Sequence, residues 1–141
     1  MDVNNAPVIA GLKIRHFQGE GDYSKIATVL TASEAADQTE RDVSAEDIAN
    51  AYSHLSNCDP GRDMIVAEVA GEMIGYTRGW WENESFGWRL YKHNGFLIPE
   101  WRQKGIGQTM LLWMEKRLRE IATTHPPEIT KVFQVNVTQF Q

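Results

Sequence analysis

Apolar residues recur with regular periods along the first half of this chain, and those periods predict one strand and two helices. Leu12–Phe17 is predicted as a strand, and Asp22 is expected to cap a helix over Tyr23–Ala32. A second helix is expected after Ser44, a favourable N-cap. Its apolar residues follow helical spacing: Ile48, Ala51, Tyr52 and Leu55. The turn sequence Asp59-Pro60-Gly61 is expected to end this helix.

The middle of the chain has the pattern of three extended segments. Met64–Val69 and Met73–Trp81 flank Ala70-Gly71-Glu72, a short hairpin connection in which the glycine suits a positive φ. Trp88–Ile98 is predicted as the third strand. Gly95 within it suggests either a bulge or a close approach of another backbone.

The longest helical pattern follows these strands. Ile106–Ala122 is predicted as an amphipathic helix, with Glu115 and Arg119 paired four residues apart. One face is apolar: Leu111, Met114, Leu118 and Ile121. The helix is expected to break at Thr123–Pro127, and Lys131–Thr138 is predicted as a strand. The order is therefore βααβββαβ, an α/β fold with a mixed sheet flanked by helices. Its last strand–helix–strand unit implies a right-handed crossover between adjacent parallel strands.

Composition narrows the class of protein. The chain has 141 residues, of which 42% are hydrophobic and 23% charged, so we expect one folded domain over residues 1–141, with 1–11 as a leader. The net charge of -5 argues against nucleic acid or an anionic membrane as partner. The single Cys58 excludes an internal disulfide and is interpreted as a packing residue. Neither a membrane-spanning run nor a secretory signal is present, which favours a cytoplasmic protein.

The segment from Leu97 to Gly107, LIPEWRQKGIG, joins a predicted strand to the start of the long helix. The first turn of a helix leaves about four N–H groups without internal partners, and its dipole favours an anion there. Gly105 and Gly107 would let a phosphate approach these amides, and Arg102 and Lys104 add positive charge. Other phosphate motifs fit poorly, because the third glycine of a dinucleotide fingerprint and the Gly-Lys-Ser/Thr ending of a P-loop are both missing.

The run Arg102-Gln103-Lys104-Gly105-Ile106-Gly107 resembles the Arg/Gln-x-x-Gly-x-Gly/Ala signature of the GCN5-related N-acetyltransferases (GNAT family). Pro99-Glu100-Trp101 is similar to the approach that precedes the signature in that family. The hairpin of residues 65–76 resembles its second and third strands, and the order of elements from Leu12 to Thr138 agrees as well.

The resemblance implies acetyl-CoA, or another acyl-CoA, as the co-substrate of a GNAT-type N-acyltransferase. Residues Gln103 to Gln108 (Gln103, Lys104, Gly105, Ile106, Gly107 and Gln108), with Arg102, would hold the pyrophosphate. The strand before the signature would splay from the strand after the helix, and the pantetheine arm would lie between them. Phe96, Leu97 and Ile98 would offer main-chain groups to that arm, with Leu97 the leading candidate. A primary amine would then attack the thioester directly.

The sequence offers no carboxylate at the usual position of the family's general base. Tyr91 and His93 lie on the same strand parity as Leu97, and they are our catalytic candidates; a partly exposed structural histidine is the alternative. Glu82 and Glu84 could reach a substrate or be solvated. We assign no role to His16, His54 and His125, and no metal-ligand spacing is present. The tryptophans Trp80, Trp81, Trp88, Trp101 and Trp113 are interpreted as packing residues, with an acceptor pocket or an interface as the alternative.

Relatives in the family usually continue with a further helix, often bearing a tyrosine, and two strands, whereas this sequence ends at Gln141. We expect a fragment of a longer chain, or a sheet completed by a second GNAT domain or by a homodimer partner. The expected acceptor is a small-molecule or peptide amine. A noncatalytic CoA-binding or structural domain is the alternative, and an interaction module built on the tryptophans is a third possibility.

Overall fold

The structure, a computed structural model, describes residues 3, 6–36 and 43–136. The elements are β1 (Leu12–His16), α1 (Tyr23–Ala36), α2 (Ala45–Tyr52), α3 (Pro60–Asp63), β2 (Met64–Val69), β3 (Glu72–Asn83), β4 (Trp88–Leu97), α4 (Ile106–Thr123) and β5 (Thr130–Asn136). Short 3-10 turns lie at Glu20–Asp22, Ser85–Gly87 and Pro99–Trp101. The predicted order βααβββαβ is confirmed, with α3 as the one addition; Val137 and Thr138 of the last predicted strand lie outside the described residues.

The short helix α3 begins where the sequence predicted only the end of α2. Asp59 is its N-cap and accepts a hydrogen bond from the Gly61 N–H at 3.1 Å, while Pro60 occupies the first turn. Four residues are too few for a helical period to show in the sequence. The cap predicted at Ser44 is confirmed, because Ser44 and Asp47 form a reciprocal capping box at the start of α2.

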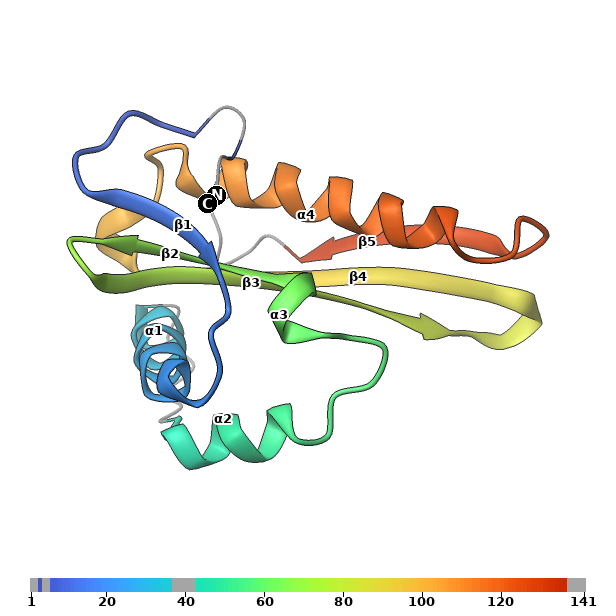
Figure 1. The fold of residues 1–141 in the computed structure, drawn as a ribbon, viewed down its shortest axis with the longest axis horizontal. Helices are drawn as coiled ribbons and strands as arrows, with labels where there is room; N and C mark the ends of the chain where they lie inside the picture. Colours follow the sequence, from blue (N-terminus) through green and yellow to red (C-terminus); the bar gives the residue numbers. More distant parts are fainter. Residues whose placement is uncertain (1–2, 4–5, 37–42, 137–141) are drawn as a thin grey trace.

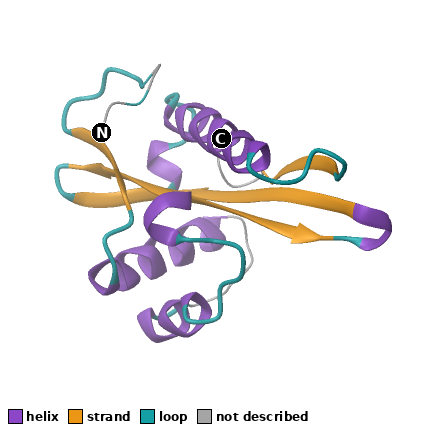
Figure 2. Ribbon diagram, turned by 45° about the vertical axis from the view of Figure 1, so that its right-hand side comes forward, coloured by secondary structure: helices purple, strands orange, loops and turns teal. Residues whose placement is uncertain are grey.

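The five strands form a single mixed sheet in the order β1-β2-β3-β4-β5. The first four are antiparallel neighbours, and β5 pairs in parallel with β4 from Trp88↔Thr130 to Asn94↔Asn136, as the strand–helix–strand pattern predicted. Figures 1 and 2 show β3 and β4 as the long strands of the sheet. The described part of β5 ends at Asn136, the partner of Asn94.

The sheet has no bulge at Gly95 and has one between β2 and β3 instead. The ladder between β3 and β4 runs without a shift from Asn83↔Arg89 to Gly75↔Leu97. The register shifts instead between β2 and β3 at Ala67/Glu68, where β3 carries an extra residue. A bulge depends on pairing between distant segments, and a glycine in one strand does not identify which ladder carries it.

Helices cover both faces of the sheet (Figure 1): α4 lies on one face, and α1 and α2 lie on the other. Side chains alternate between these faces along each strand. On the α1 face the core contains Ile26, Val29, Met64, Val66 and Tyr76, and on the α4 face it contains Ile14, Ile65, Leu97, Ile106 and Met110. Burial of these two apolar surfaces stabilises the three layers.

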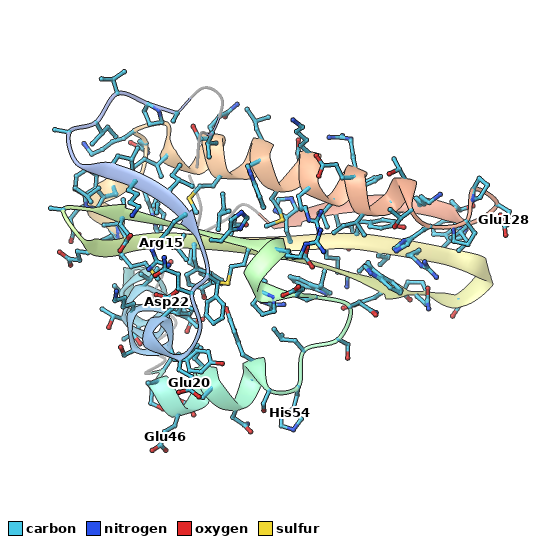
Figure 3. The ribbon with its side chains drawn as sticks, in the orientation of Figure 1. Arg15, Glu20, Asp22, Glu46, His54 and Glu128 are labelled. Carbon is cyan, nitrogen blue, oxygen red and sulfur yellow. The ribbon has the colours of Figure 1, made fainter. Side chains whose placement is uncertain are left out.

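A buried charged cluster joins β1, β2 and the turn before α1. The sequence predicted that Asp22 caps α1, and this is wrong. The Asp22 carboxylate instead accepts hydrogen bonds from both terminal nitrogens of Arg15, at 2.8 and 3.0 Å, and from the Gln18 N–H at 2.8 Å. Arg15 Nε also donates to Glu68 at 2.8 Å. Figure 3 shows Arg15 and Asp22 directed toward each other. The arginine therefore satisfies two buried carboxylates, which ties β1 to its neighbours.

In the described segments, every helix is too short or too polar to cross a lipid bilayer.

Candidate functional site

The segment between β4 and α4 reverses the chain within a few residues. After the 3-10 turn Pro99–Trp101, Gln103 and Gly105 both adopt positive φ angles, 62° and 88°. Gly105, with ψ of -6°, is the N-cap residue of α4 in the left-handed region, which glycine enters without steric cost. The second glycine expected in the cradle, Gly107, lies buried in the first turn of the helix.

Among the described residues, no side chain caps the first turn of α4. Its N-cap offers no side-chain hydrogen bond, and no acidic residue lies in the turn. Ile106 is buried against the α4-face core and anchors the turn, whereas Gln103, Lys104 and Gln108 are exposed around it. The free N–H groups and the positive end of the helix dipole therefore form a site that suits a phosphate or a diphosphate.

Arg102 does not contribute its charge to this cradle. Its Nε donates to the Leu97 carbonyl at 2.9 Å, and its Nη2 donates to Ser33 Oγ of α1 at 2.9 Å. The guanidinium is thus directed back into the fold, where it holds the end of β4 and the loop together. Among the basic residues of the run that precedes α4, Lys104 is the exposed one.

Within the described residues, the end of β4 has an edge beside the cradle to which no strand is paired. The Ile98 N–H donates to the Ile74 carbonyl of the β3 segment at 2.9 Å. Main-chain groups alternate in direction along an antiparallel strand, so the N–H groups of Gly95 and Leu97 point to the opposite edge. Described pairing with β5 ends at Asn94. The Leu97 N–H is therefore a donor next to the start of α4, and its carbonyl is engaged by Arg102.

His93 faces α4 rather than that edge. It is 4% exposed and lies in a small pocket with residues of α4 and β5: Glu115, Leu118, Arg119, Phe133 and Gln134. Burial lowers the pKa of His93 from 6.5 to about 4, since the charged imidazolium loses its hydration. At neutral pH the ring is uncharged, and its low pKa makes it a weak base.

Tyr91, the second catalytic candidate, lies deeper in the same layer. The side chain is fully buried, stacks on Phe133, and its hydroxyl lies 2.6 Å from His125 Nδ1. Burial raises the pKa of the phenol above its ordinary value. Six residues separate Tyr91 from Leu97 along the strand, a distance of about 20 Å. The structure therefore does not bring Tyr91 close to the cradle.

On the other face of β4 lie polar residues that the sequence analysis did not single out. Asn94 pairs directly with Arg78 of β3. Both are partly exposed and share the face opposite α4. The alternation of faces along the strand could have indicated these residues, because positions 92 and 94 lie on the opposite face from the buried positions 91 and 93. Their neighbours across the sheet follow only from the register.

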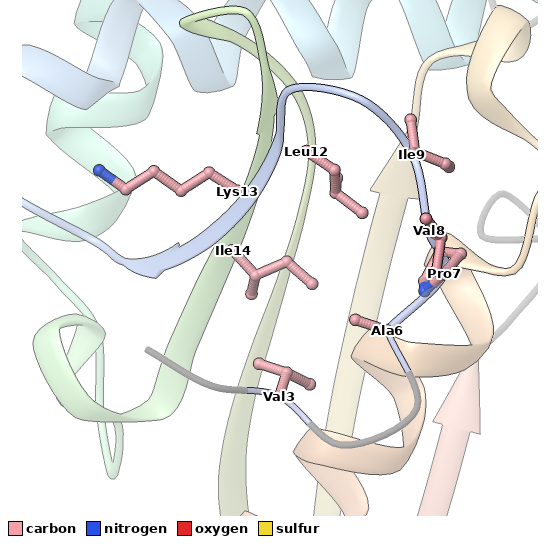
Figure 4. Close-up of a pocket in the computed structure, with 8 residues that line it drawn as sticks. All are labelled: Val3, Ala6, Pro7, Val8, Ile9, Leu12, Lys13 and Ile14. Atoms are coloured by element: carbon pink, nitrogen blue, oxygen red, sulfur yellow. The ribbon is translucent and has the colours of Figure 1, made fainter.

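The N-terminal segment borders the cradle at Gly105. A Cβ atom built on Gly105 would lie 3.6 Å from Pro7 Cβ, an ordinary van der Waals contact. A pocket lies beneath this segment, lined mainly by apolar side chains together with Lys13 (Figure 4). None of the residues expected to hold CoA lines it, so this pocket is separate from the candidate site.

Two other residues considered in the sequence analysis, Glu82 and Trp113, contact neighbouring side chains of the fold. Glu82 accepts hydrogen bonds from Trp80 Nε1 at 2.9 Å and from Lys92 Nζ at 3.0 Å, which lower the pKa of its carboxyl. Trp113 packs edge-on against the ring of His16 on β1. Within residues 3, 6–36 and 43–136, no group of three His, Cys, Asp or Glu side chains is arranged to hold a metal ion.

Solved structures share this architecture. A GCN5-related N-acetyltransferase from Sphaerobacter thermophilus superposes with a TM-score of 0.73 at 23% identity over 88% of this chain and 37% of its own. The putative acetyltransferase yncA of Salmonella typhimurium, solved with acetyl-CoA, gives 0.58 at 18% identity over 79% of this chain and 65% of its own. The ribosomal-protein-alanine N-acetyltransferase of Brucella melitensis gives 0.59 at 25% identity over 77% of this chain and 68% of its own.

The chain thus spans about a third of the Sphaerobacter protein and about two thirds of the other two. A search of curated protein sequences gave no match. The sequence profile described as the acetyltransferase (GNAT) family matches residues 24–127, a segment that contains the signature run, the β2–β3 hairpin and both layers of helices. The chain therefore belongs to the acetyltransferase (GNAT) family.

Proposed function

We propose that this chain binds acetyl-CoA, or another acyl-CoA, and transfers the acyl group to a primary amine. The uncapped first turn of α4 is the observation that carries the proposal, because it offers main-chain donors and no negative charge to a diphosphate. Gln103, Lys104, Gly105, Ile106, Gly107 and Gln108 would surround that diphosphate. The solved complex of the Salmonella relative with acetyl-CoA supports this choice of co-substrate.

The pantetheine arm would lie along the edge of β4 that faces away from β3. The Leu97 N–H is the donor best placed for it, and Phe96 and Ile98 flank that position. Arg102 acts here as a positioning residue, because its bonds to the Leu97 carbonyl and to Ser33 fix the edge relative to α1. The thioester would then lie near Asn94, three residues before Leu97 on β4.

In the proposed reaction, the amine nitrogen attacks the thioester carbonyl carbon. The new C–N bond forms as the C–S bond breaks, CoA leaves as a thiolate that takes up a proton, and the amine loses one proton. The buried positions of His93 and Tyr91 support packing roles for both. We therefore propose that water on the open face of the sheet accepts the proton from the amine, and that the protein mainly holds the reactants together.

The substitution Gly107→Glu tests the cradle, because it places bulk and negative charge in the first turn of α4. We expect CoA affinity, measured by calorimetry, to fall more than 100-fold, since a charge is buried against the diphosphate. Gly21→Glu is the control, because a Cβ atom built at this exposed position meets no atom within 4 Å. Lys104→Glu, on an exposed side chain, should weaken binding about tenfold without affecting folding. Unchanged affinity in both cradle variants would place the ligand elsewhere.

A noncatalytic CoA-binding domain is the second candidate, and the burial of both sequence-predicted catalytic side chains favours it. The two functions separate in a thiol-release assay. An acyltransferase releases free CoA thiol from acetyl-CoA when a suitable amine is added, whereas a binding domain gives only a thermal shift with CoA.

A further inference from the structure

The face of β4 opposite α4 is open near the proposed thioester position. Along the strand, Tyr91 and His93 are buried beneath α4, whereas Lys92 and Asn94 between and beyond them are partly exposed. On this face α1 covers the C-terminal end of the strand, where Phe96 packs against the α1-face core. An amine from solvent would therefore reach β4 from the side of Lys92 and Asn94.

Arg78 lies directly beside that position. It is the partner of Asn94 in the β3–β4 ladder, so the Cβ atoms of the two residues are about 5 Å apart. Its guanidinium lies 4.7 Å from the centroid of the Trp80 ring and 5.7 Å from that of the Tyr52 ring. The two rings fix its orientation, and within the described residues it forms no ion pair with a carboxylate.

The groups around Arg78 leave its charge uncompensated. Burial raises the pKa of Tyr52 to about 12 and also raises the pKa of the nearby Cys58 thiol, so both are neutral at pH 7. Glu82, a carboxylate further along β3 on this face, is already engaged by Lys92. A partly buried guanidinium without a carboxylate favours an anionic ligand group.

Asn94 supplies a second unfilled interaction. Its side-chain Oδ1 is buried and has no hydrogen-bond partner among the described residues. Its backbone carbonyl is occupied by the Thr77 hydroxyl at 2.7 Å, so the side-chain oxygen is the acceptor left for a ligand. Buried acceptors are nearly always paired in folded proteins, and an amine or ammonium group is a suitable donor.

We propose that the acceptor of this chain is a small amine that also carries an anionic group, a carboxylate or a phosphate, with the anion on Arg78 and an amine N–H on Asn94 Oδ1. The proposal rests on the proposed function and names its acceptor class. Because the two groups are cross-strand neighbours, amine and anion are separated by only a few bonds. Polycations would be disfavoured by repulsion from Arg78. An aminoglycoside acetyltransferase of similar fold has been solved in complex with sisomicin. An anionic amine as acceptor would distinguish this chain from that protein.

The experiment compares matched amines in the thiol-release assay with acetyl-CoA: β-alanine with β-alaninamide, phosphoethanolamine with ethanolamine, and spermidine as a polycation. We expect kcat/KM to be 10- to 100-fold higher for the anionic member of at least one pair. Arg78→Met should remove that preference through the KM for the amine and leave the KM for acetyl-CoA unchanged; Arg78→Lys should restore part of it. Arg89→Met is the matched control, because Arg89 also lies over a tryptophan ring, at 4.2 Å, but at the far end of the hairpin.

Asn94→Leu separates a binding role from a structural one. Replacing an unpartnered buried oxygen by an apolar group should leave the melting temperature unchanged or raise it, while kcat/KM for the preferred amine falls about tenfold or more. A loss of melting temperature together with unchanged selectivity would overturn the role given to Asn94.

A further assay, with succinyl-CoA in place of acetyl-CoA, tests whether the anion that Arg78 binds belongs to the amine or to the acyl group. If succinyl-CoA with a neutral amine surpasses acetyl-CoA with an anionic amine, Arg78 reads the acyl group, and the acceptor proposal is wrong. It is also wrong if neutral amides or spermidine are acetylated as well as the anionic amines, or if no anionic amine is acetylated or bound. Failure of the proposed function has a different result: CoA then gives no thermal shift in the wild-type protein, and calorimetry with phosphoethanolamine and ethanolamine alone decides the anion preference.

Discussion

The buried His93 makes the stability of this protein depend on pH in a defined window. The folded pKa is about 4, whereas an unperturbed histidine titrates at 6.5, and burial is the cause. Above 6.5 the ring is neutral in both states and the full stability is present. As the pH falls from 6.5 toward 4, only the unfolded chain gains the proton, so the free energy of unfolding falls.

The size of this effect follows from the two pKa values. Each pH unit in the window costs about 1.4 kcal/mol, and the window spans about two and a half units, so His93 contributes a loss of about 3 kcal/mol between pH 6.5 and pH 4. That is a large part of the stability of a domain of this size, typically about 5–15 kcal/mol.

Urea denaturation of wild type and His93→Leu from pH 7.5 to pH 4 measures this loss. Between pH 6.5 and pH 4, the free energy of unfolding should fall by about 3 kcal/mol less in the variant than in wild type. A change in packing would shift the stability of the variant equally at every pH and would not alter this difference. His54→Gln, which changes an exposed histidine, is the control. Equal pH dependence of wild type and His93→Leu, or a ring titration near 6.5 by NMR, would refute the burial argument.

The same variant tests catalysis. A general base contributes typically about 10²–10⁴-fold, so a His93 that acted as one would lose that much kcat in His93→Leu. We expect a change of less than about fivefold, because the ring faces α4. A larger loss, with a pH–rate profile that shifts in the variant, would restore His93 as the base.

Two substitutions test the packing that holds the site. Gly75→Ala should destabilise the fold by about 1–3 kcal/mol in urea denaturation, because its Cβ would lie 2.9 Å from the Phe96 carbonyl oxygen, whereas Gly21→Ala, in open space, should change stability by less than about 0.5 kcal/mol; similar values for both would contradict the steric argument. Asp22→Asn should cost about 2–4 kcal/mol at pH 7, because it weakens the paired contact with the buried Arg15. Burial by itself would raise the pKa of Asp22, but the hydrogen bonds to its carboxylate outweigh burial and lower that pKa. The contribution of Asp22 to the free energy of unfolding is therefore present above about pH 4 and is lost below it. If wild type and Asp22→Asn lost stability equally in acid, this reasoning would be refuted.

Local patterns predicted the elements because their causes are local. The capping box at Ser44 and the hairpin glycine Gly71, with φ of 82°, depend only on neighbouring residues, and both are confirmed. Predicted and observed ends differ at a few places: α1 continues to Ala36, and α2 ends at Tyr52 rather than including Leu55. Such ends are set by packing and by caps, which periodicity does not record.

The sequence by itself determined the order of elements, the family and the position of the cradle at Gly105, because a glycine run between a strand and a helix has one local structure that suits it. Only the tertiary structure decided which side chains meet. It directed Arg102 to the Leu97 carbonyl and His93 beneath α4, and it paired Arg78 with Asn94 on the open face. Those outcomes depend on register and on which face each helix covers, and both are fixed by contacts between segments far apart in the chain.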